Sequence, residues 1–509
     1  MLEPSRQYKR GLKQAVDWKL VFCYLILVLI GWVNIYASIH SSDPSSIFDW
    51  TARSGKQFIW ICSSLGLAAL ILFVFNARLW EVISVPSYLL VLGLLVLVIF
   101  VSNDVKGSHS WFELGPVKFQ PAEISKITTS LLLAHVMSKS SFRMSRFKDF
   151  LLVALIIGVP MLTIVAESET GSALVYVGFI FMLYREGLTG WIIAFGGMCI
   201  LLFILTLTGS AYTAIMVLAL VVTLCYALQS GKIGKWLITC GIGLIFLAFF
   251  PRIWTSVCNS LVPGASILGE VDASVADAIL NASKWSVLVK VKPIYLLIAI
   301  SAVTIPIAVG KAYREKKTYL WVAVLAFVLG MGLTFSTEFI FNDVLEDHQR
   351  ARIEVLLGMK EDIKGVGYNV NQSKIAIGSG GLTGKGFLQG TQTTYGFVPE
   401  QSTDFIFCTV GEEWGFIGCT IVILLYVFLI YRIICDAEKC REAFTRIYGY
   451  CVASCIFMHL AINVGMTVGL MPVIGIPLPL LSYGGSSLWA FTILIFIFIA
   501  LDRDEKKYF

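Results

Sequence analysis

The chain has 509 residues, of which 57% are hydrophobic and 14% are charged, whereas a typical soluble domain has about 25% charged residues. Together with a mean hydropathy of +0.81, this composition excludes soluble globular, disordered, collagenous and disulfide-stapled proteins and indicates an all-α polytopic integral membrane protein. The net charge of +6 is expected when basic residues concentrate in loops on one side of a membrane, so we expect no nucleic-acid partner.

Apolar runs bounded by charged or turn residues predict about 14 membrane-spanning helices. They cover residues 20–39, 58–75, 82–101, 122–137, 150–166, 171–184, 191–207, 212–228, 236–250, 294–310, 319–336, 405–430, 448–469 and 486–501. Basic residues precede the first run without a small-residue cleavage site. This pattern favours an uncleaved first span and a cytoplasmic N-terminal segment at residues 1–19.

The basic residues predict the orientation of these spans. If the N-terminus is cytoplasmic, each loop after an even-numbered span is cytoplasmic and should hold Lys and Arg residues. Every such loop does, as does the tail at residues 502–509. Three long loops then lie outside the cytoplasm, at residues 102–121, 251–293 and 337–404. The last is rich in glycine and in large apolar residues, so we expect it to fold over the outer end of the helices.

This last outer loop has a composition that suits an anionic ligand. Seven glycines lie between residues 365 and 386, and they permit close backbone approach and an anion-binding nest of amides. A pyrophosphate on a lipid would suit the positive charge that four residues add, namely Arg350, Arg352, Lys374 and Lys385. A solvated basic surface whose glycines only permit tight turns accounts for the same residues.

Asp362 is the carboxylate that we single out in this loop, because it lies among glycines and cations on the outer side. A carboxylate within reach of an attacking hydroxyl acts as a general base, while nearby cations stabilise a departing pyrophosphate. The alternative is an ordinary surface aspartate that caps a turn.

Charged residues also occur within the apolar runs, where they persist only when paired or facing water. Glu123 and Lys126 are three residues apart, so they lie on one helical face and can pair. Further carboxylates are Glu167, Glu169, Glu412 and Glu413. Together they predict a polar cavity open to the outer leaflet, although an ion pathway or simple structural pairing uses the same residue types. Residues 469–487, rich in Pro and Gly, are predicted to form irregular backbone in the wall of this cavity.

The 12 cysteines lie mostly in apolar runs without a CxxC pair, which is typical of small hydrophobic residues. Cys451, Cys455 and His459 follow an i, i+4, i+8 spacing that a soft metal ion can use. We favour helix packing for these three residues, because no neighbouring carboxylate or second histidine completes a ligand set.

Three long motifs stand out, at Gly367 to Gly381, Gly386 to Phe407 and Asn463 to Leu488. They closely resemble the SEDS family of cell-wall proteins. A fourth match combines Trp111 with Gln120-Pro121-Ala122-Glu123 and Lys126, and it is similar to the family pattern W…QPSE..K. The segment Gly396 to Gln401 resembles the elongation branch of the family more than the division branch.

The resemblance implies a SEDS-type helical bundle with a ten-span core, an insertion and a large extracytoplasmic loop. The core would comprise residues 20–207, the span 319–336, the catalytic loop 337–404 and residues 405–501, with the insertion at 208–318. The family polymerises lipid II into glycan strands in the bacterial inner membrane. The resemblance therefore implies a peptidoglycan glycosyltransferase of cell-wall elongation, with both termini cytoplasmic and with a class B penicillin-binding protein and the elongation machinery as partners.

The resemblance also implies site residues. An essential aspartate of the family aligns with Asp362, cavity residues align with Glu123 and Lys126, and Trp111 would line the mouth of the outer loop. Motif positions implied to bind substrate are Glu400, Asp404, Ser482, Gly484 and Gly485. In this scheme Asp362 deprotonates the acceptor sugar hydroxyl, which displaces undecaprenyl pyrophosphate from the donor with inversion. We expect no cofactor, and a divalent cation between the pyrophosphate and Asp362 is the alternative.

Several positions depart from the family pattern. The family's LDPxxDPxGxGY is represented here by residues 357–368, without the first aspartate and both prolines. QPDxGT is replaced around Glu167 and Glu169, and Ser110 stands where a basic residue is usual. Two other functions use the same features: a flippase that moves the lipid-linked precursor without chemistry, and a scaffold for the cell-wall machinery.

Overall fold

The computed structural model describes residues 16–39, 46–102, 110–114, 117–230, 233–261, 292–316, 318–345, 347–360, 365 and 367–508. Asp362 and most of the predicted outer loop 251–293 lie outside these residues. Within the described ranges the regular secondary structure is helical apart from one short hairpin, which confirms the predicted all-α fold class.

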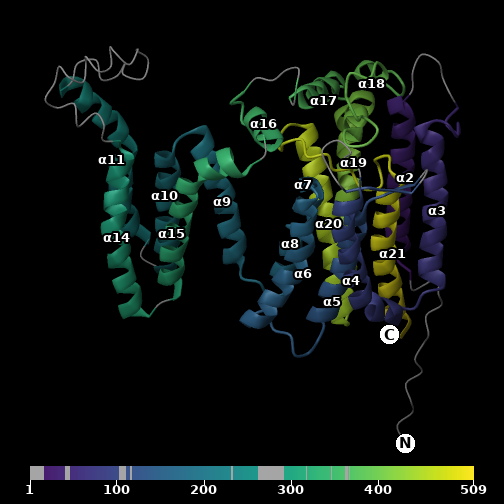
Figure 1. Ribbon diagram of the computed structural model, residues 1–509, viewed down its shortest axis with the longest axis horizontal. Helices are drawn as coiled ribbons and strands as arrows, with labels where there is room; N and C mark the ends of the chain where they lie inside the picture. Colours follow the sequence, from purple (N-terminus) through teal and green to yellow (C-terminus); the bar gives the residue numbers. More distant parts are fainter. Residues whose placement is uncertain are drawn as a thin grey trace, which may run out of the picture. The chain divides into compact units, whose positions relative to one another are not determined.

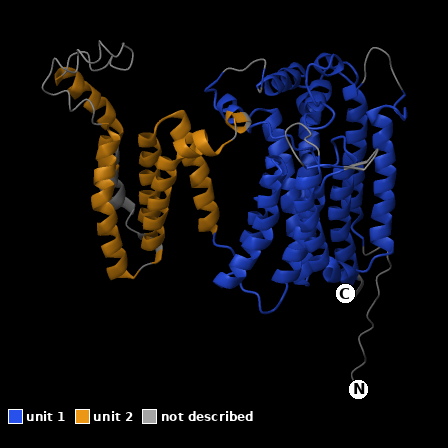
Figure 2. Cartoon of the chain, viewed as in Figure 1, with its two compact units in different colours: residues 1–189, 351–509 blue, residues 190–350 orange. Residues whose placement is uncertain are grey.

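The chain divides into two compact units (Figures 1 and 2). Unit 1 comprises residues 1–189 and 351–509, and unit 2 comprises residues 190–350. The insertion predicted at residues 208–318 falls within unit 2. The domain boundaries drawn from the sequence remain predictions.

Unit 1 contains most of the helices. The first segment forms α2 (Trp18–Ile39), α3 (Arg53–Phe73), α4 (Ala77–Val101), α5 (Pro121–Met137), α6 (Phe147–Ala166), α7 (Thr170–Tyr176) and α8 (Phe179–Arg185). The second segment forms α17 (Tyr368–Ser379), α18 (Thr391–Thr394), α19 (Ile406–Lys439), α20 (Ala443–Thr467) and α21 (Gly485–Tyr508). Helices from the two sequence segments pack against each other, for example α20 against α5 and α21 against α3. A hairpin of β1 (Phe112–Leu114) and β2 (Val117–Phe119) precedes α5, with Phe112 opposite Phe119.

Unit 2 consists of long apolar helices. They are α9 (Gly190–Thr208), α10 (Ala211–Ser230), α11 (Ile233–Leu261), α14 (Ile294–Glu315) and α15 (Thr318–Phe339), and a π-helical turn, η2 (Ile340–Val344), extends the last one. The division between the two units falls within the sequence of helix α16 (Asp347–Leu356), after Arg350.

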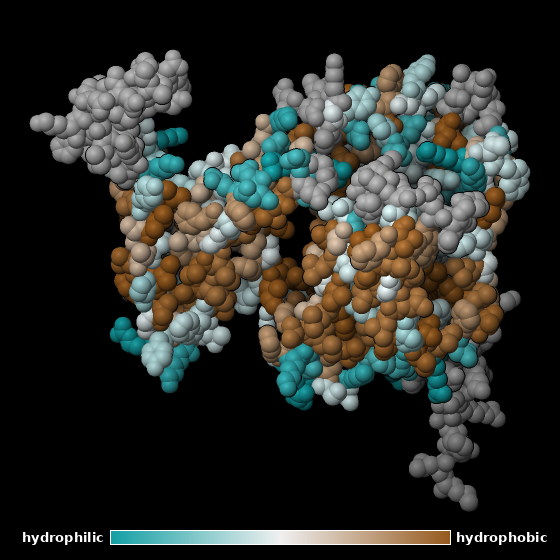
Figure 3. Space-filling view, in the orientation of Figure 1, coloured by the Kyte–Doolittle hydropathy of each residue, from teal (hydrophilic) through white to brown (hydrophobic). Residues whose placement is uncertain are grey.

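The described residues include 12 helices that are long and apolar enough to cross a membrane. The other two predicted spans fall on shorter helices, α5 and the pair α7–α8. In each unit, apolar side chains cover the middle of the helices and hydrophilic ones gather near their ends (Figure 3). This distribution is the one that a lipid bilayer requires, so the chain is a multi-pass membrane protein.

Helices α5 and α20 form the interior of unit 1. Fourteen of the 17 residues of α5 are buried, and α20 packs against α5, α19 and α21. Glycine allows a close approach at Gly31 of α2, where an added Cβ would lie 2.6 Å from the Cα of Leu481. The irregular segment between α20 and α21, residues 468–484, is thereby held inside the bundle, as its Pro and Gly content predicts.

Helix α19 is broken near its N-terminal end. Gly415 has φ 62° and ψ −159°, a conformation that is almost restricted to glycine. The carbonyls freed by this kink accept hydrogen bonds from the glycine-rich segment that follows α17: the Lys385 N–H donates to Glu412 O at 3.0 Å, and the Gly386 N–H donates to Glu413 O at 3.0 Å. The kink therefore fixes part of the predicted outer loop to the bundle.

Candidate active site

A recess in unit 1 lies where α16, α17 and the segment after α20 meet. The empty volume of this recess is about 410 Å³, which includes a part that is open to solvent. Two of its lining residues, Arg352 and Lys374, are cations that the sequence predicts to bind a pyrophosphate. The other lining residues are Val355, Leu356, Val370, Asn371, Gly469, Met471, Pro472 and Val473.

Lys374 lies against Gly469, whose backbone conformation favours glycine. Gly469 has φ +78°, and a Cβ at this position would lie 2.2 Å from the Cε and 2.4 Å from the Nζ of Lys374. Helix α17 is in turn fixed to the end of α20, because Ser373 donates a hydrogen bond to Thr467 O at 2.6 Å. The Lys374 side chain is exposed, and its ammonium group lies beside Gly469 in the wall of the recess.

Arg352 has an acidic neighbour. Burial lowers the pKa of its guanidinium, while the charge of Glu169 opposes that shift. Ser110, which replaces the basic residue of the family pattern, donates a hydrogen bond to Glu169 Oε2 at 3.3 Å. Burial, and then the charge of Glu169, raise the pKa of Glu167 to about 8. The loop between α6 and α7 therefore supplies Glu169, whose charge acts on Arg352, and Glu167, which binds a proton near neutral pH.

Asp362, the predicted general base, lies outside the described residues. The described residues on both sides of it in the sequence, Leu356 and Val370, line the recess. Its role remains a prediction.

Glu123 and Lys126 form a buried network with His459. Lys126 Nζ donates to Glu123 Oε1 at 2.8 Å and to His459 Nε2 at 2.8 Å. His459 Nδ1 lies 3.2 Å from Pro477 O, and the Lys126 ammonium lies 5.4 Å from the centroid of the Phe491 ring. The predicted i, i+3 pair therefore exists, and it is connected to α20 and to the segment after it.

Lys385 lies in a separate group around the α19 kink. Its Nζ is 2.6 Å from Glu412 Oε1, and the carboxylate of Glu412 also accepts the N–H groups of Gln392 at 2.8 Å and Thr393 at 2.9 Å. Glu413 Oε1 accepts the Leu388 N–H at 3.2 Å. These predicted cavity residues hold the loop around α18 in place.

Arg350 and Trp111 are not among the residues that line the recess. Arg350 belongs to unit 2, where its Nε donates to Phe341 O at 3.0 Å and its Nη2 donates to Asn342 O. It thereby caps the carbonyls at the end of η2. Trp111 is half-buried and directly precedes β1.

The remaining predicted substrate residues surround the join between the 400–405 segment and α21. Ser482 Oγ donates to Thr403 O at 2.6 Å, and the Gly484 N–H donates to Gln57 Oε1 at 3.3 Å. Gly485 allows close packing, because an added Cβ would lie 2.5 Å from the Trp60 ring. Asp404 accepts a hydrogen bond at its backbone oxygen from Asn463, at 2.8 Å.

A second, more open recess contains Glu400. Arg53, Gln401 and Ser402 also line it. Arg53 donates a hydrogen bond to Ser402 Oγ, and its guanidinium lies 5.8 Å from the Tyr483 ring. Sequence reasoning did not select Arg53; its position just before an apolar run was the available signal.

Sequence reasoning also missed the contacts of His459 and Asn463. A buried Lys126 has only donors and therefore needs acceptors, which is a signal for a polar partner but does not identify it. The described cysteines are free thiols, and no group of three or more His, Cys, Asp or Glu residues suited to a metal ion occurs within the described part of the chain. Nε2 of His459 is occupied by Lys126.

The sequence matches the FtsW/RodA/SpoVE family, described as "Cell cycle protein", over residues 17–246 and 278–507. The chain belongs to this family. This membership confirms the SEDS resemblance of the motifs.

Among its relatives, this FtsW/RodA/SpoVE protein is 29% identical over 496 residues to the peptidoglycan glycosyltransferase RodA of Treponema pallidum, covering 96% of this chain and 98% of that protein. It is 46% identical over 145 residues to the peptidoglycan glycosyltransferase MrdB of Escherichia coli strain K12, covering 28% of this chain and 39% of MrdB. The Treponema alignment is long enough to include most of unit 2.

Two solved structures share its fold. A peptidoglycan synthase complex, described as coordinating polymerization and crosslinking, has 21% identity and a TM-score of 0.56, with 96% of this chain and 98% of that chain covered. RodA of Thermus thermophilus has 21% identity and a TM-score of 0.51, with 96% and 97% covered.

Proposed function

We propose that this protein is a peptidoglycan glycosyltransferase that polymerises lipid II during cell-wall elongation. Its family membership and the activity named for its Treponema relative support this proposal. The observation that carries it is the recess lined by Arg352 and Lys374. Arg352 precedes Asp362 in the sequence and Lys374 follows it.

In the proposed reaction, Asp362 accepts the proton of the acceptor sugar hydroxyl. The hydroxyl oxygen forms a bond to the anomeric carbon of the donor, and the bond from that carbon to the undecaprenyl pyrophosphate oxygen breaks. Arg352 and Lys374 bind the departing pyrophosphate, because cations stabilise negative charge that develops on a leaving group. Glu169 limits the net positive charge near Arg352 when no substrate is bound.

We further propose that the recess faces the outside of the cytoplasmic membrane. The loops that the sequence assigns to the cytoplasm hold the basic residues. Within unit 1, α17 and α18 lie at the end opposite the C-terminus of α21 (Figure 1). A cytoplasmic C-terminus therefore corresponds to an extracytoplasmic recess, and an even number of spans places the N-terminus on the same side as the C-terminus.

A class B penicillin-binding protein is the proposed partner, because the product needs cross-linking. The structural likeness to a peptidoglycan synthase complex supports a partner of this kind. We propose no resident cofactor. Polymerisation that persists in excess EDTA supports this proposal, whereas loss of activity that Mg²⁺ restores supports the divalent cation.

The deciding experiment compares chemistry with transport. The purified protein is reconstituted with lipid II, and glycan polymer is resolved on a gel while transbilayer movement of labelled lipid II is followed in vesicles. We expect polymer from the wild type and none from Asp362→Ala. Movement of lipid II that survives Asp362→Ala, without polymer from either protein, would identify a flippase, and the absence of both activities would favour a scaffold.

A further inference from the structure

His459 is buried at the point where three parts of unit 1 meet. It lies on α20, its side chain contacts Lys126 of α5, and its other ring nitrogen faces the backbone of the segment between α20 and α21. Lys126 is 2% exposed and His459 is 0% exposed. An ordinary packing residue needs none of these polar contacts, whereas each buried polar atom here needs a hydrogen-bond partner.

The partners determine which nitrogen of the imidazole carries the proton. An ammonium group only donates hydrogen bonds, so Nε2 of His459 accepts from Lys126. Nδ1 then carries the proton and donates to Pro477 O at 3.2 Å. The neutral ring thus accepts a hydrogen bond from α5 on one side and donates one on the other side to Pro477 O, a carbonyl outside the helices. The Phe491 ring, whose centroid is 4.8 Å away, holds the imidazole edge to face.

A second residue of α20 fastens the same segment. Asn463, one helical turn after His459, donates through Nδ2 to Ile476 O at 2.7 Å and to Asp404 O at 2.8 Å. Two successive turns of α20 therefore hold the carbonyls of residues 476 and 477. The N-terminal part of this segment supplies Gly469, Met471, Pro472 and Val473 to the wall of the recess.

We propose that His459 is a positioning residue for glycan polymerisation, which couples the buried Glu123–Lys126 pair to the segment whose earlier residues line one wall of the recess. The expected effect on the polymerisation rate rests on the proposed function. The expected effect on the backbone of the segment between α20 and α21 rests on the hydrogen bonds alone. Glu123 Oε2 is buried and accepts no hydrogen bond from the described residues.

The test uses two substitutions of similar size. His459→Gln can accept from Lys126 with its amide oxygen and donate to Pro477 O with its amide nitrogen, whereas His459→Phe keeps a planar ring and loses both bonds. Tyr448→Phe is the matched control, because Tyr448 is buried on the same helix and donates to Leu494 O at 3.2 Å. This control loses one buried hydrogen bond of α20 toward α21, away from the recess.

Polymerisation rates are measured against lipid II concentration and divided by the folded fraction. We expect His459→Phe to lower kcat/KM by about tenfold or more, as the loss of hydrogen bonds to a charged group implies. His459→Gln and Tyr448→Phe should stay within about threefold of the wild type. Equal loss in His459→Gln and His459→Phe would show that the imidazole itself is needed, and an unchanged rate in His459→Phe would show that it positions nothing; either result overturns the inference.

Amide hydrogen exchange gives an answer that does not depend on the enzymatic proposal. In His459→Phe, peptides that cover residues 474–484 should exchange at least about tenfold faster than in the wild type, because the backbone loses an anchor. Those peptides should be unchanged in His459→Gln and Tyr448→Phe. Unchanged exchange in His459→Phe would refute the inference even if the wild type makes no polymer, and a wild type without polymer refutes only the proposed function.

Discussion

At the level of single residues, Arg352 and Lys374 are the cations whose placement the proposed reaction needs. Each neutral substitution, Arg352→Gln or Lys374→Gln, should lower kcat/KM for lipid II by about tenfold or more, because a charge-assisted hydrogen bond contributes about 1.5–3 kcal/mol. Lys56→Gln removes the same charge from an exposed position in the first turn of α3 and should leave the rate unchanged. Equal rates in all three variants would exclude the recess as the pyrophosphate site.

Glu167 gives a second prediction at this scale. Its pKa is raised to about 8 by burial and by the charge of Glu169, so the folded protein holds a proton that the unfolded chain releases above its ordinary pKa. The stabilisation is complete below the ordinary pKa of 4.5 and is lost progressively as the pH rises from there to about 8. Thermal unfolding in detergent should show that Glu167→Gln raises Tm relative to the wild type more at pH 8.5 than at pH 5.5. An equal difference at both pH values would contradict the assigned shift.

The site residues differ in how far the sequence could predict them. Glu123 and Lys126 are three residues apart, so helical geometry alone predicts their pairing. His459 is 333 residues from Lys126, and no local rule connects the two helices. Charge and proximity in sequence predict that Lys385 binds the pyrophosphate together with Arg352 and Lys374. The kink in α19 draws it to Glu412 instead, which depends on packing that composition does not reveal.

At the level of helices, the conformation of Gly415 is the most specific requirement. An added Cβ would lie 2.3 Å from Gly384 N, and φ is +62°. Gly415→Ala should therefore lower the free energy of unfolding by about 1–3 kcal/mol or more through backbone strain alone. Gly93→Ala in α4 is the control, because nothing lies within 4 Å of its added Cβ. A Gly415→Ala protein that unfolds at the same temperature as Gly93→Ala would contradict the kinked conformation.

Apolar runs predicted each long helix, because burying backbone polar groups in lipid leaves a helix as the only local solution. They could not predict the breaks. The run at 171–184 forms two short helices, α7 and α8, that meet at Gly178, where an added Cβ would lie 2.3 Å from the side chain of Met458. The run at 405–430 continues as a kinked helix to Lys439. These details arise from contacts with α20 and with the glycine-rich loop, which are distant in sequence.

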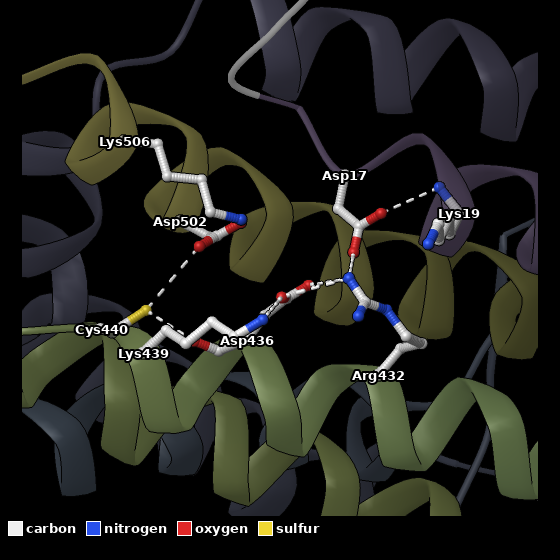
Figure 4. Close-up of polar contacts among 8 residues, drawn as sticks. All are labelled: Asp17, Lys19, Arg432, Asp436, Lys439, Cys440, Asp502 and Lys506. Atoms are coloured by element: carbon white, nitrogen blue, oxygen red, sulfur yellow. Dashed lines mark hydrogen bonds and ion pairs between the residues drawn. The ribbon is translucent and has the colours of Figure 1, made fainter. Parts of the chain in front are cut away.

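At the level of the whole molecule, a charge cluster joins the start of the first helix to the ends of two later ones (Figure 4). Arg432 of α19 pairs with Asp17, just before α2, and with Asp436 at 3.3 Å. Lys506 of α21 pairs with Asp502 at 2.5 Å. The cluster fastens segments that are more than 400 residues apart in sequence, at the end of unit 1 that we assign to the cytoplasm.

Removal of the shared cation should destabilise unit 1. Arg432→Met leaves Asp17 and Asp436 without their main partner, and breaking a buried pair from one side costs about 3–5 kcal/mol, toward the lower end here because Arg432 is partly exposed. Lys439→Met is the control, since its side chain is 66% exposed and 4.0 Å from Asp436. Thermal unfolding in detergent should show a clear loss of Tm for Arg432→Met alone. Equal melting temperatures would mean that the cluster contributes little to stability.

The most direct test of the central claim is the initial rate of glycan polymerisation by wild type, Asp362→Asn and Glu361→Gln in nanodiscs with lipid II. Asp362→Asn keeps the shape of the side chain and removes its basicity, and Glu361→Gln removes the neighbouring carboxylate as a matched control. The account predicts a loss of about 10²-fold or more for Asp362→Asn, as expected for a general base, and a near-normal rate for Glu361→Gln. Polymer made by Asp362→Asn at the wild-type rate would contradict it.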